Sequence, residues 1–106
     1  MVSINDFQQL EIRIAQVLDA QPHPNADRLL VLKIKVGEVE KQIVAGIRTS
    51  YAADQLIGKK IVVVNNLEPA VIRGVESQGM LLAASDDKGH SVLTPDRDVS
   101  SGAQVR

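Results

Sequence analysis

Apolar residues alternate with polar ones along residues 30–36, and this two-residue period constrains the fold more than any other feature of the chain. A period of two places an apolar row on one face of an extended strand and leaves Lys33 and Lys35 together on the other face. Turn residues follow at 37–38, and a second apolar run at residues 41–45 returns along the first. The pattern predicts a β-hairpin with its apolar face in a core and its lysines exposed.

The segment before this hairpin predicts a short helix, a bent strand and a loop. Ser3 precedes the helix and has the short polar side chain of an N-cap. The strand at residues 11–20 alternates at first, but Val17 and Leu18 are adjacent apolar residues, so we expect a bulge or bend there. Two prolines make residues 21–27 a loop, because proline cannot donate a hydrogen bond to a strand ladder.

The second half of the chain contains further short apolar runs separated by turn residues. Thr49 or Ser50 is expected to cap a helix at residues 51–57, and Gly58 is expected to end it. Strands are expected at residues 59–64, 71–74, 80–84 and 91–93. The spacing predicts an all-β fold, a five-stranded Greek-key barrel of the OB (oligonucleotide/oligosaccharide-binding) type. A short N-terminal helix, one helix between strands 3 and 4 and a C-terminal extension complete the prediction.

Length and composition fit one domain that covers residues 1–106. Apolar residues make up 44% of the chain and charged residues 24%, which are ordinary values for a globular protein. Cysteine is absent, so disulfides and thiolate metal sites are excluded. No apolar run reaches the length of a membrane span and no export signal is recognisable, so we expect a cytoplasmic protein with no membrane partner.

The sequence contains few residues or motifs that are typical of a catalytic site. Its two histidines, His23 and His90, have no nucleophile at a recognisable spacing, and no GxxxxGK phosphate loop is present. His23 and Asp27 would supply two metal ligands, which is too few for a structural site. We therefore expect a non-enzymatic domain without a metal or cofactor.

The formal net charge of −1 hides an uneven distribution. Residues 1–27 carry a net charge of −3, residues 28–73 of +4 and residues 74–106 of −2. A basic centre is compatible with an ordinary solvated surface and also with a polyanionic partner. Phe7 and Tyr51 are too few aromatic side chains to stack a series of bases, so recognition of a folded RNA through its phosphates fits better than single-strand binding.

The stretch GVESQGM at residues 74–80 lies between two apolar runs and has two interpretations. As a turn, Gly74 and Gly79 would adopt backbone angles that other residues avoid. As a contact surface, the hydroxyl of Ser77 and the adaptable thioether of Met80 would form a small patch at the barrel mouth that suits a splayed nucleotide.

Four stretches of the chain together resemble one known family. They are LEIRIAQVLDAQPHPNADRLLVLKIKVG, IVAGIRTSYAADQLIGKKIVVVNNLEP, IRGVESQGMLLAASDD and VLTPD. From about Ile4 to Val105 the sequence resembles the tRNA-binding domain at the C-terminus of methionyl-tRNA synthetases, and equally the free-standing small tRNA-binding proteins built on this module. The resemblance implies an OB barrel, a homodimer formed through the terminal extensions, and shape-dependent binding near the outer corner of tRNA that supports aminoacylation. Whether the catalytic part of a synthetase is attached or the chain stands alone is left open.

The same resemblance implies the site residues. Those implied to contact RNA are Asn25, Arg28, Lys33, Arg73, Ser77 and Met80. Lys35, Arg48, Lys59 and Lys60 are weaker candidates, because each is equally well explained as a solvated charge. The chain departs from the family at Val71 and Ile72, which are apolar where many relatives are basic, and at Ala15, where many relatives have glycine.

Two other functions fit the same fold. A secretion-related relative binds proteins as a chaperone, and such a module would present an exposed apolar groove instead of a basic rim. A domain that only dimerises a synthetase would use terminal apolar side chains that one barrel has little use for. The candidates for this interface are Phe7, Leu10, Leu93, Val99 and Val105.

Overall fold

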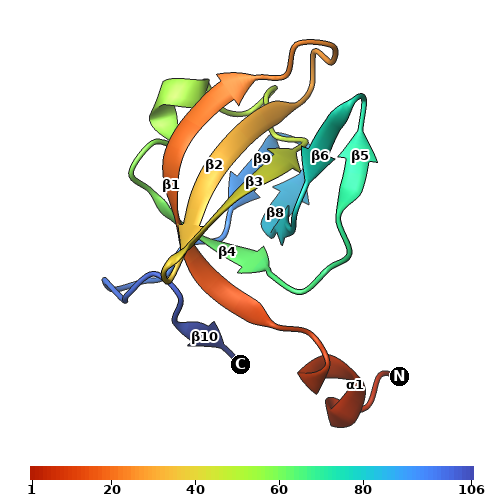
Figure 1. The fold of residues 1–106 in the computed structure, drawn as a ribbon, viewed down its shortest axis with the longest axis vertical. Coiled ribbons are helices and arrows are strands. Elements are labelled where there is room, and N and C mark those ends of the chain that lie inside the picture. The colour runs from red at the N-terminus through yellow and green to blue at the C-terminus, as the bar shows by residue number, and fades with distance from the viewer.

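The chain begins with a short helix that stands apart from the rest of the molecule. The computed structural model describes all 106 residues and places helix α1 at Ile4–Gln8. The Ser3 hydroxyl oxygen accepts a hydrogen bond from the Asp6 N–H at 3.1 Å, which confirms the predicted N-cap. No residue of α1 is buried, and the helix projects away from the strands (Figure 1).

Three long strands form the predicted hairpin and its neighbour. They are β1 (Ile12–Pro22), β2 (Leu30–Val36) and β3 (Val39–Ala45), all antiparallel. The register of β1 against β2 shifts between Val17 and Asp19, so the expected bulge is confirmed. Strand β1 runs two residues further than predicted because Pro22 pairs with Leu30 at the very end of the strand, where little of the ladder depends on its missing N–H.

Strand β1 belongs to two parts of one curled sheet. Its first half pairs with β4 (Lys60–Val64) and its second half with β2, and the order of strands is β3-β2-β1-β4-β7 with β7 at Met80–Leu81. The short β10 (Gln104–Val105) pairs with the beginning of β1. The bulge lets one continuous strand turn from one side of the barrel to the other.

The GVESQGM stretch joins the two edges of this sheet and closes the barrel. The Gln78 N–H donates to the Gln42 carbonyl at 2.8 Å, and the Val44 N–H donates to the Ser77 hydroxyl at 2.9 Å. Gly79 lies so close to β4 that a Cβ there would stand 3.0 Å from the Val64 carbonyl oxygen. The predicted all-β barrel of the OB type is confirmed, and residues 77–79 are its closing segment.

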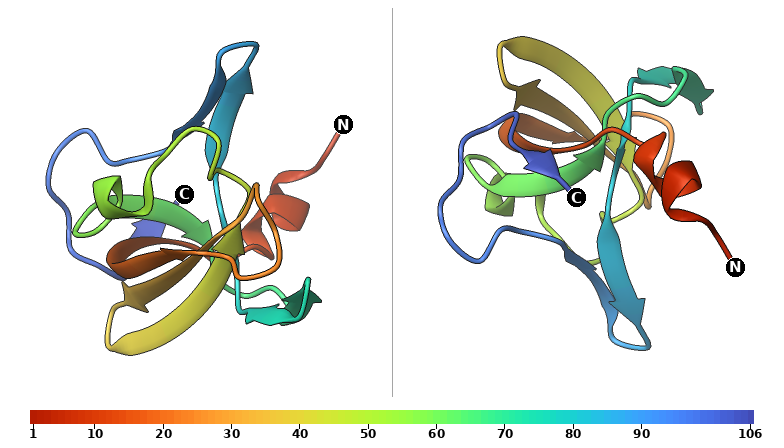
Figure 2. Two further views of the ribbon diagram at one scale, coloured as in Figure 1. Left: turned by 90° about the horizontal axis from the view of Figure 1, so that it is seen from above. Right: turned by 90° about the horizontal axis from the view of Figure 1, so that it is seen from below.

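Two small hairpins lie outside the main sheet. Strands β5 (Ala70–Ile72) and β6 (Val75–Ser77) pack beside β3, and β8 (Ala83–Asp86) and β9 (Gly89–Val92) project from the barrel (Figure 2). Residues 75–77 are therefore a strand and not the predicted turn. The turn lies at Arg73 and Gly74, whose φ angles of 52° and 88° are those of a tight two-residue hairpin. The predicted strand 80–84 is divided between β7 and β8.

The helix expected at residues 51–57 is a single 3-10 turn, η1 (Ala53–Gln55). The Gln55 side chain accepts a hydrogen bond from the Ala52 N–H at 2.7 Å and so begins the turn. The Ser50 hydroxyl is not its cap, because that oxygen accepts the His90 N–H at 2.9 Å. The element is in the predicted connection between β3 and β4 and contacts β1, whereas Ser50 and Tyr51 just before it are hydrogen-bonded to β9.

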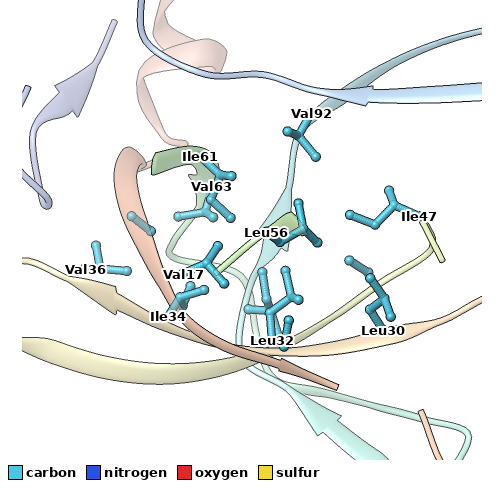
Figure 3. Packing of buried hydrophobic residues seen from close by; sticks show 14 residues of the cluster. Val17, Leu30, Leu32, Ile34, Val36, Ile47, Leu56, Ile61, Val63 and Val92 are labelled. Carbon is cyan, nitrogen blue, oxygen red and sulfur yellow. The ribbon is translucent and has the colours of Figure 1, made fainter. Parts of the chain in front are cut away.

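The barrel interior is filled by aliphatic side chains from every main strand (Figure 3). A second, smaller cluster of Ile12, Ile14, Val62 and Val64 lies outside that interior and is covered by residues of the C-terminal extension. Burying each such side chain stabilises the fold by roughly 1.5–3 kcal/mol. None of the helices in the structure is long and apolar enough to cross a membrane.

Candidate nucleic-acid interface

The loop between β1 and β2 is fastened to the β5–β6 hairpin by one buried side chain. His23 is 3% exposed; its Nδ1 accepts the Asn25 N–H at 2.9 Å and its Nε2 lies 3.0 Å from the Ile72 carbonyl oxygen. Because Nδ1 accepts a hydrogen bond, Nε2 carries the hydrogen and donates it to Ile72. From the sequence, His23 was interpreted only as part of a turn. Its hydrogen bond to Ile72 could not be predicted, because the two residues are 49 positions apart in the chain.

Arg28 belongs to this loop, and the side chains of Arg48 and Arg73 are bonded to its carbonyl oxygens. Arg73 Nη2 donates to the Asn25 carbonyl at 3.1 Å, and Arg48 Nη1 donates to the Ala26 carbonyl at 3.1 Å. The Arg48 N–H also donates to the Arg28 carbonyl at 3.3 Å. A guanidinium has five N–H donors, so Arg48 and Arg73 keep most of theirs for a ligand. We call Asn25, Arg28, Arg48 and Arg73 the loop-end surface.

A groove continues from the loop-end surface along the outside of the barrel. It has a volume of about 360 Å³ and lies between the β1–β2 sheet and the β5–β6 hairpin. Its lining includes Asp19, Gln21, Pro24, Lys33, Gln42 and Val75, and we call it the hairpin groove. Lys33 also borders a second hollow of about 210 Å³ with Lys41 and Gln78. Lys33 thus lies in the groove that begins beside the loop at Pro24, whereas Arg48 borders a separate hollow that Tyr51 also lines.

Ser77 and Met80, predicted together, have different environments. Met80 is 47% exposed on β7. Ser77 is only 3% exposed, and its hydroxyl accepts from the Val44 N–H and donates to the Gly79 carbonyl at 3.0 Å. An RNA contact would require both bonds to break. The Ser77 hydroxyl therefore helps to close the barrel, and its contribution to RNA binding stays a prediction.

Three of the weaker candidates lie elsewhere. Lys35 and Lys60 flank Gln16 on neighbouring strands. Lys60 Nζ is 2.7 Å from Asp98 Oδ1 and also donates to the Val99 carbonyl, so its charge is already paired. Lys59 is exposed and borders a separate depression of about 590 Å³ formed with residues 94–98. These lysines are not part of the region around the β1–β2 loop.

One carboxylate of the barrel has a shifted pKa, and it lies outside the loop-end surface. Asn65 Nδ2 donates to Glu11 Oε1 at 2.8 Å, and Arg13 Nε lies 3.3 Å from the same oxygen. The hydrogen bond from Asn65, followed by the contact with Arg13, lowers the pKa of Glu11. This arrangement joins the start of β1 to the end of β4 and has a structural role.

The predicted interface residues divide into two groups. Phe7, Leu10 and Leu93 are 40%, 44% and 41% exposed. Val99 and Val105 pack against the second cluster of the same chain, so the expectation that one barrel has little use for them is wrong. Their burial is explained by the C-terminal extension, which covers the outside of β1 and β4.

The fold and the loop-end surface together define the class of protein: a small binding module built on an OB-type barrel, with arginines at one loop end. Residues 12–104 match the family described as "Putative tRNA binding domain", and the chain belongs to this family. It is 45% identical over 105 residues to a methionine–tRNA ligase of Thermococcus onnurineus and 44% identical over 104 residues to one of Caldanaerobacter subterraneus. These matches cover 99% and 98% of this chain but only 14% and 16% of the ligases.

Solved structures with the same fold include both a synthetase-related protein and a chaperone. A protein from Pyrococcus horikoshii described as MetRS-related superimposes with a TM-score of 0.93 at 31% identity, covering 100% of this chain and 98% of that one. The chaperone CsaA of Bacillus anthracis superimposes with a TM-score of 0.91 at 30% identity, covering 100% and 99%. The chain is therefore homologous both to the binding domain of methionine–tRNA ligases and to CsaA-like proteins.

Proposed function

We propose that this chain binds tRNA by its shape and has no catalytic activity of its own. In this proposal it acts as the C-terminal domain of a methionyl-tRNA synthetase, or as a free-standing relative, and supports aminoacylation by raising the affinity for tRNA. The observation that carries the proposal is the convergence of Arg28, Arg48 and Arg73 on the β1–β2 loop in a chain of net charge −1. The relatives named as ligases support it.

Phosphate groups are the ligands that this surface suits best. The arginines present guanidinium donors, which bind phosphate oxygens in pairs. Phe7 lies on α1, away from this surface, and Tyr51, which lines a hollow beside Arg48, has its hydroxyl occupied by the Val92 N–H, so no series of aromatic side chains is available to stack bases. Binding through charges at fixed positions selects a backbone of matching shape instead of a base sequence.

We further propose that the chain forms a homodimer through α1. The helix buries none of its own side chains, and Ile4 is 67% exposed beside the 40% of Phe7 and the 44% of Leu10. An apolar helix surface of this kind is stabilised when a second copy covers it. A dimer would present two loop-end surfaces to one tRNA and so increase the number of phosphate contacts.

Titration of folded tRNA and of the same tRNA after thermal unfolding without magnesium tests the main proposal. Folded tRNA is expected to bind at least tenfold more tightly, and Arg73→Ala is expected to weaken that binding. Lys59→Ala is the matched control, because Lys59 is exposed but lies outside the loop-end surface. Equal binding of both RNA forms, or equal effects of the two variants, would reject shape recognition at this surface.

A protein-binding role is the second candidate function. It is favoured by the 30% identity to the CsaA chaperone over the whole chain and by Val71, which is 72% exposed on β5 where many tRNA-binding relatives are basic. A pull-down with unfolded client proteins distinguishes the two functions. Capture of clients that excess tRNA does not displace would favour the chaperone function.

A further inference from the structure

The hairpin groove contains an acid and a base that face each other without forming an ion pair. Asp19 and Lys33 are directly opposed residues of β1 and β2, and opposed residues project from the same face of a sheet. The ion pairs of the structure are Arg13–Glu11 and Lys60–Asp98, so the charged groups of Asp19 and Lys33 are not in direct contact. The bulge beside Asp19 re-aims the strand at this point.

Each of the two groups keeps free capacity for hydrogen bonds. Asp19 Oδ2 accepts one from Gln21 Nε2 at 3.2 Å, which orients the carboxylate and leaves Oδ1 without a partner. Lys33 Nζ makes no hydrogen bond within the chain, and the residue is exposed. A carboxylate accepts hydrogen bonds and an ammonium donates them, so a ligand between them must offer both kinds of group.

The remaining walls of the hairpin groove suit a flat, neutral body. Pro22, Pro24, Val31 and Val75 contribute apolar surface, and the volume of about 360 Å³ lies within the range of small ligand sites. Because Asp19 and Lys33 carry opposite charges, the groove has no net positive charge to hold a phosphate. The groove is therefore shaped for a nucleobase, whereas the neighbouring loop-end surface is shaped for phosphates.

The donor and acceptor pattern selects among the bases. Guanine presents two adjacent N–H donors, N1–H and N2–H, directly beside the O6 acceptor on its Watson–Crick edge. Adenine and cytosine each present a single amino group beside a ring-nitrogen acceptor on that edge, and uracil presents one N–H between two carbonyls, so none of them has two adjacent donor groups. Guanine thus offers two donors to Asp19 and one acceptor to Lys33.

We propose that the hairpin groove binds an unpaired guanine of the RNA, with Asp19 accepting from N1–H and N2–H and Lys33 donating to O6. The inference rests on the proposed tRNA-binding function and adds base recognition to it. An unpaired base is needed because base pairing would occupy this edge. Asp19 and Lys33 are then specificity residues, and the arginines supply most of the affinity.

RNA stem–loops with one variable loop position test the proposal by fluorescence anisotropy. The position carries guanine, inosine, adenine or uracil, and inosine differs from guanine only by lacking the N2 amino group. Guanine is expected to bind about tenfold more tightly than adenine or uracil, with inosine between them. Asp19→Asn is expected to abolish this preference without weakening the binding of the adenine stem–loop, because the substitution removes a negative charge and no cation. Lys59→Met is the control and should retain the preference.

Two results would overturn the proposal, and they differ from failure of the tRNA-binding function. Equal affinity for all four stem–loops, with intact binding of whole tRNA, rejects guanine recognition alone. Asp19→Asn that keeps the preference for guanine while binding every RNA more tightly shows that Asp19 acts only as a repelling charge, which also rejects it. Absence of binding to whole tRNA rejects the proposed function itself. Circular dichroism of each variant establishes that the barrel is folded, so that a lost preference reports on the groove.

Discussion

The Ser77 hydroxyl provides a quantitative test of how the barrel closes. Its two hydrogen bonds, from the Val44 N–H and to the Gly79 carbonyl, each contribute about 1 kcal/mol net. Ser77→Ala removes both and leaves the Val44 N–H without an acceptor, so the free energy of unfolding should fall by about 2 kcal/mol. For a domain of this size the loss lowers the midpoint of thermal unfolding by roughly 10 °C.

Thermal unfolding followed by circular dichroism measures this loss, and tRNA titration well below the transition measures affinity. The affinity of the folded variant should stay within twofold of the parent, because the hydroxyl is not exposed to RNA. Ser100→Ala is the control, since Ser100 is exposed and its change should alter stability by less than about 0.5 kcal/mol. Unchanged stability with clearly weakened tRNA binding would refute the structural role and restore Ser77 as a contact.

Three further experiments test the β1–β2 loop, the loss of stability at acid pH and the dimer. His23→Ala should weaken tRNA binding more than His23→Asn, because an asparagine oxygen can still accept the Asn25 N–H; equal losses would contradict this. The lowered pKa of Glu11 means that its contribution to stability is present at neutral pH and is lost as the pH falls through the pKa of the folded state, so Glu11→Gln should flatten the acid side of a urea-stability profile. Phe7→Asp combined with Leu10→Asp should convert a dimer to a monomer in sedimentation velocity, whereas the equally exposed Ile57→Asp should not.

The periodic parts of the sequence allowed the fold to be predicted. The alternation at residues 30–36 placed the hairpin, and the adjacent Val17 and Leu18 located the bulge of β1. The predicted helix at residues 51–57 was too long, because the Ser50 hydroxyl accepts the N–H of His90 instead of capping it. The local sequence pattern could not predict this hydrogen bond, because its two partners are 40 residues apart in the chain.

The candidate site could be predicted only in part, and for the same reason. The arginines and lysines of the basic segment indicated a surface that binds a polyanion. The family resemblance indicated which of these residues contact RNA. The burial of Ser77 and the packing of Val99 and Val105 against the second cluster depend on contacts distant in the sequence, which no local pattern contains. The opposition of Asp19 and Lys33 depends on the register of two strands across a bulge, which sequence alone did not define.

The salt dependence of tRNA binding tests the central claim, that the loop-end surface holds the phosphates, most directly. If Arg28 and Arg73 each neutralise one phosphate, the combined variant Arg28→Ala and Arg73→Ala should reduce the slope of log affinity against log salt by about 1.8. The matched pair Lys59→Ala and Arg97→Ala, which removes two charges from the separate depression, should leave the slope unchanged. An equal reduction by both pairs, or none by the arginine pair, would contradict the account.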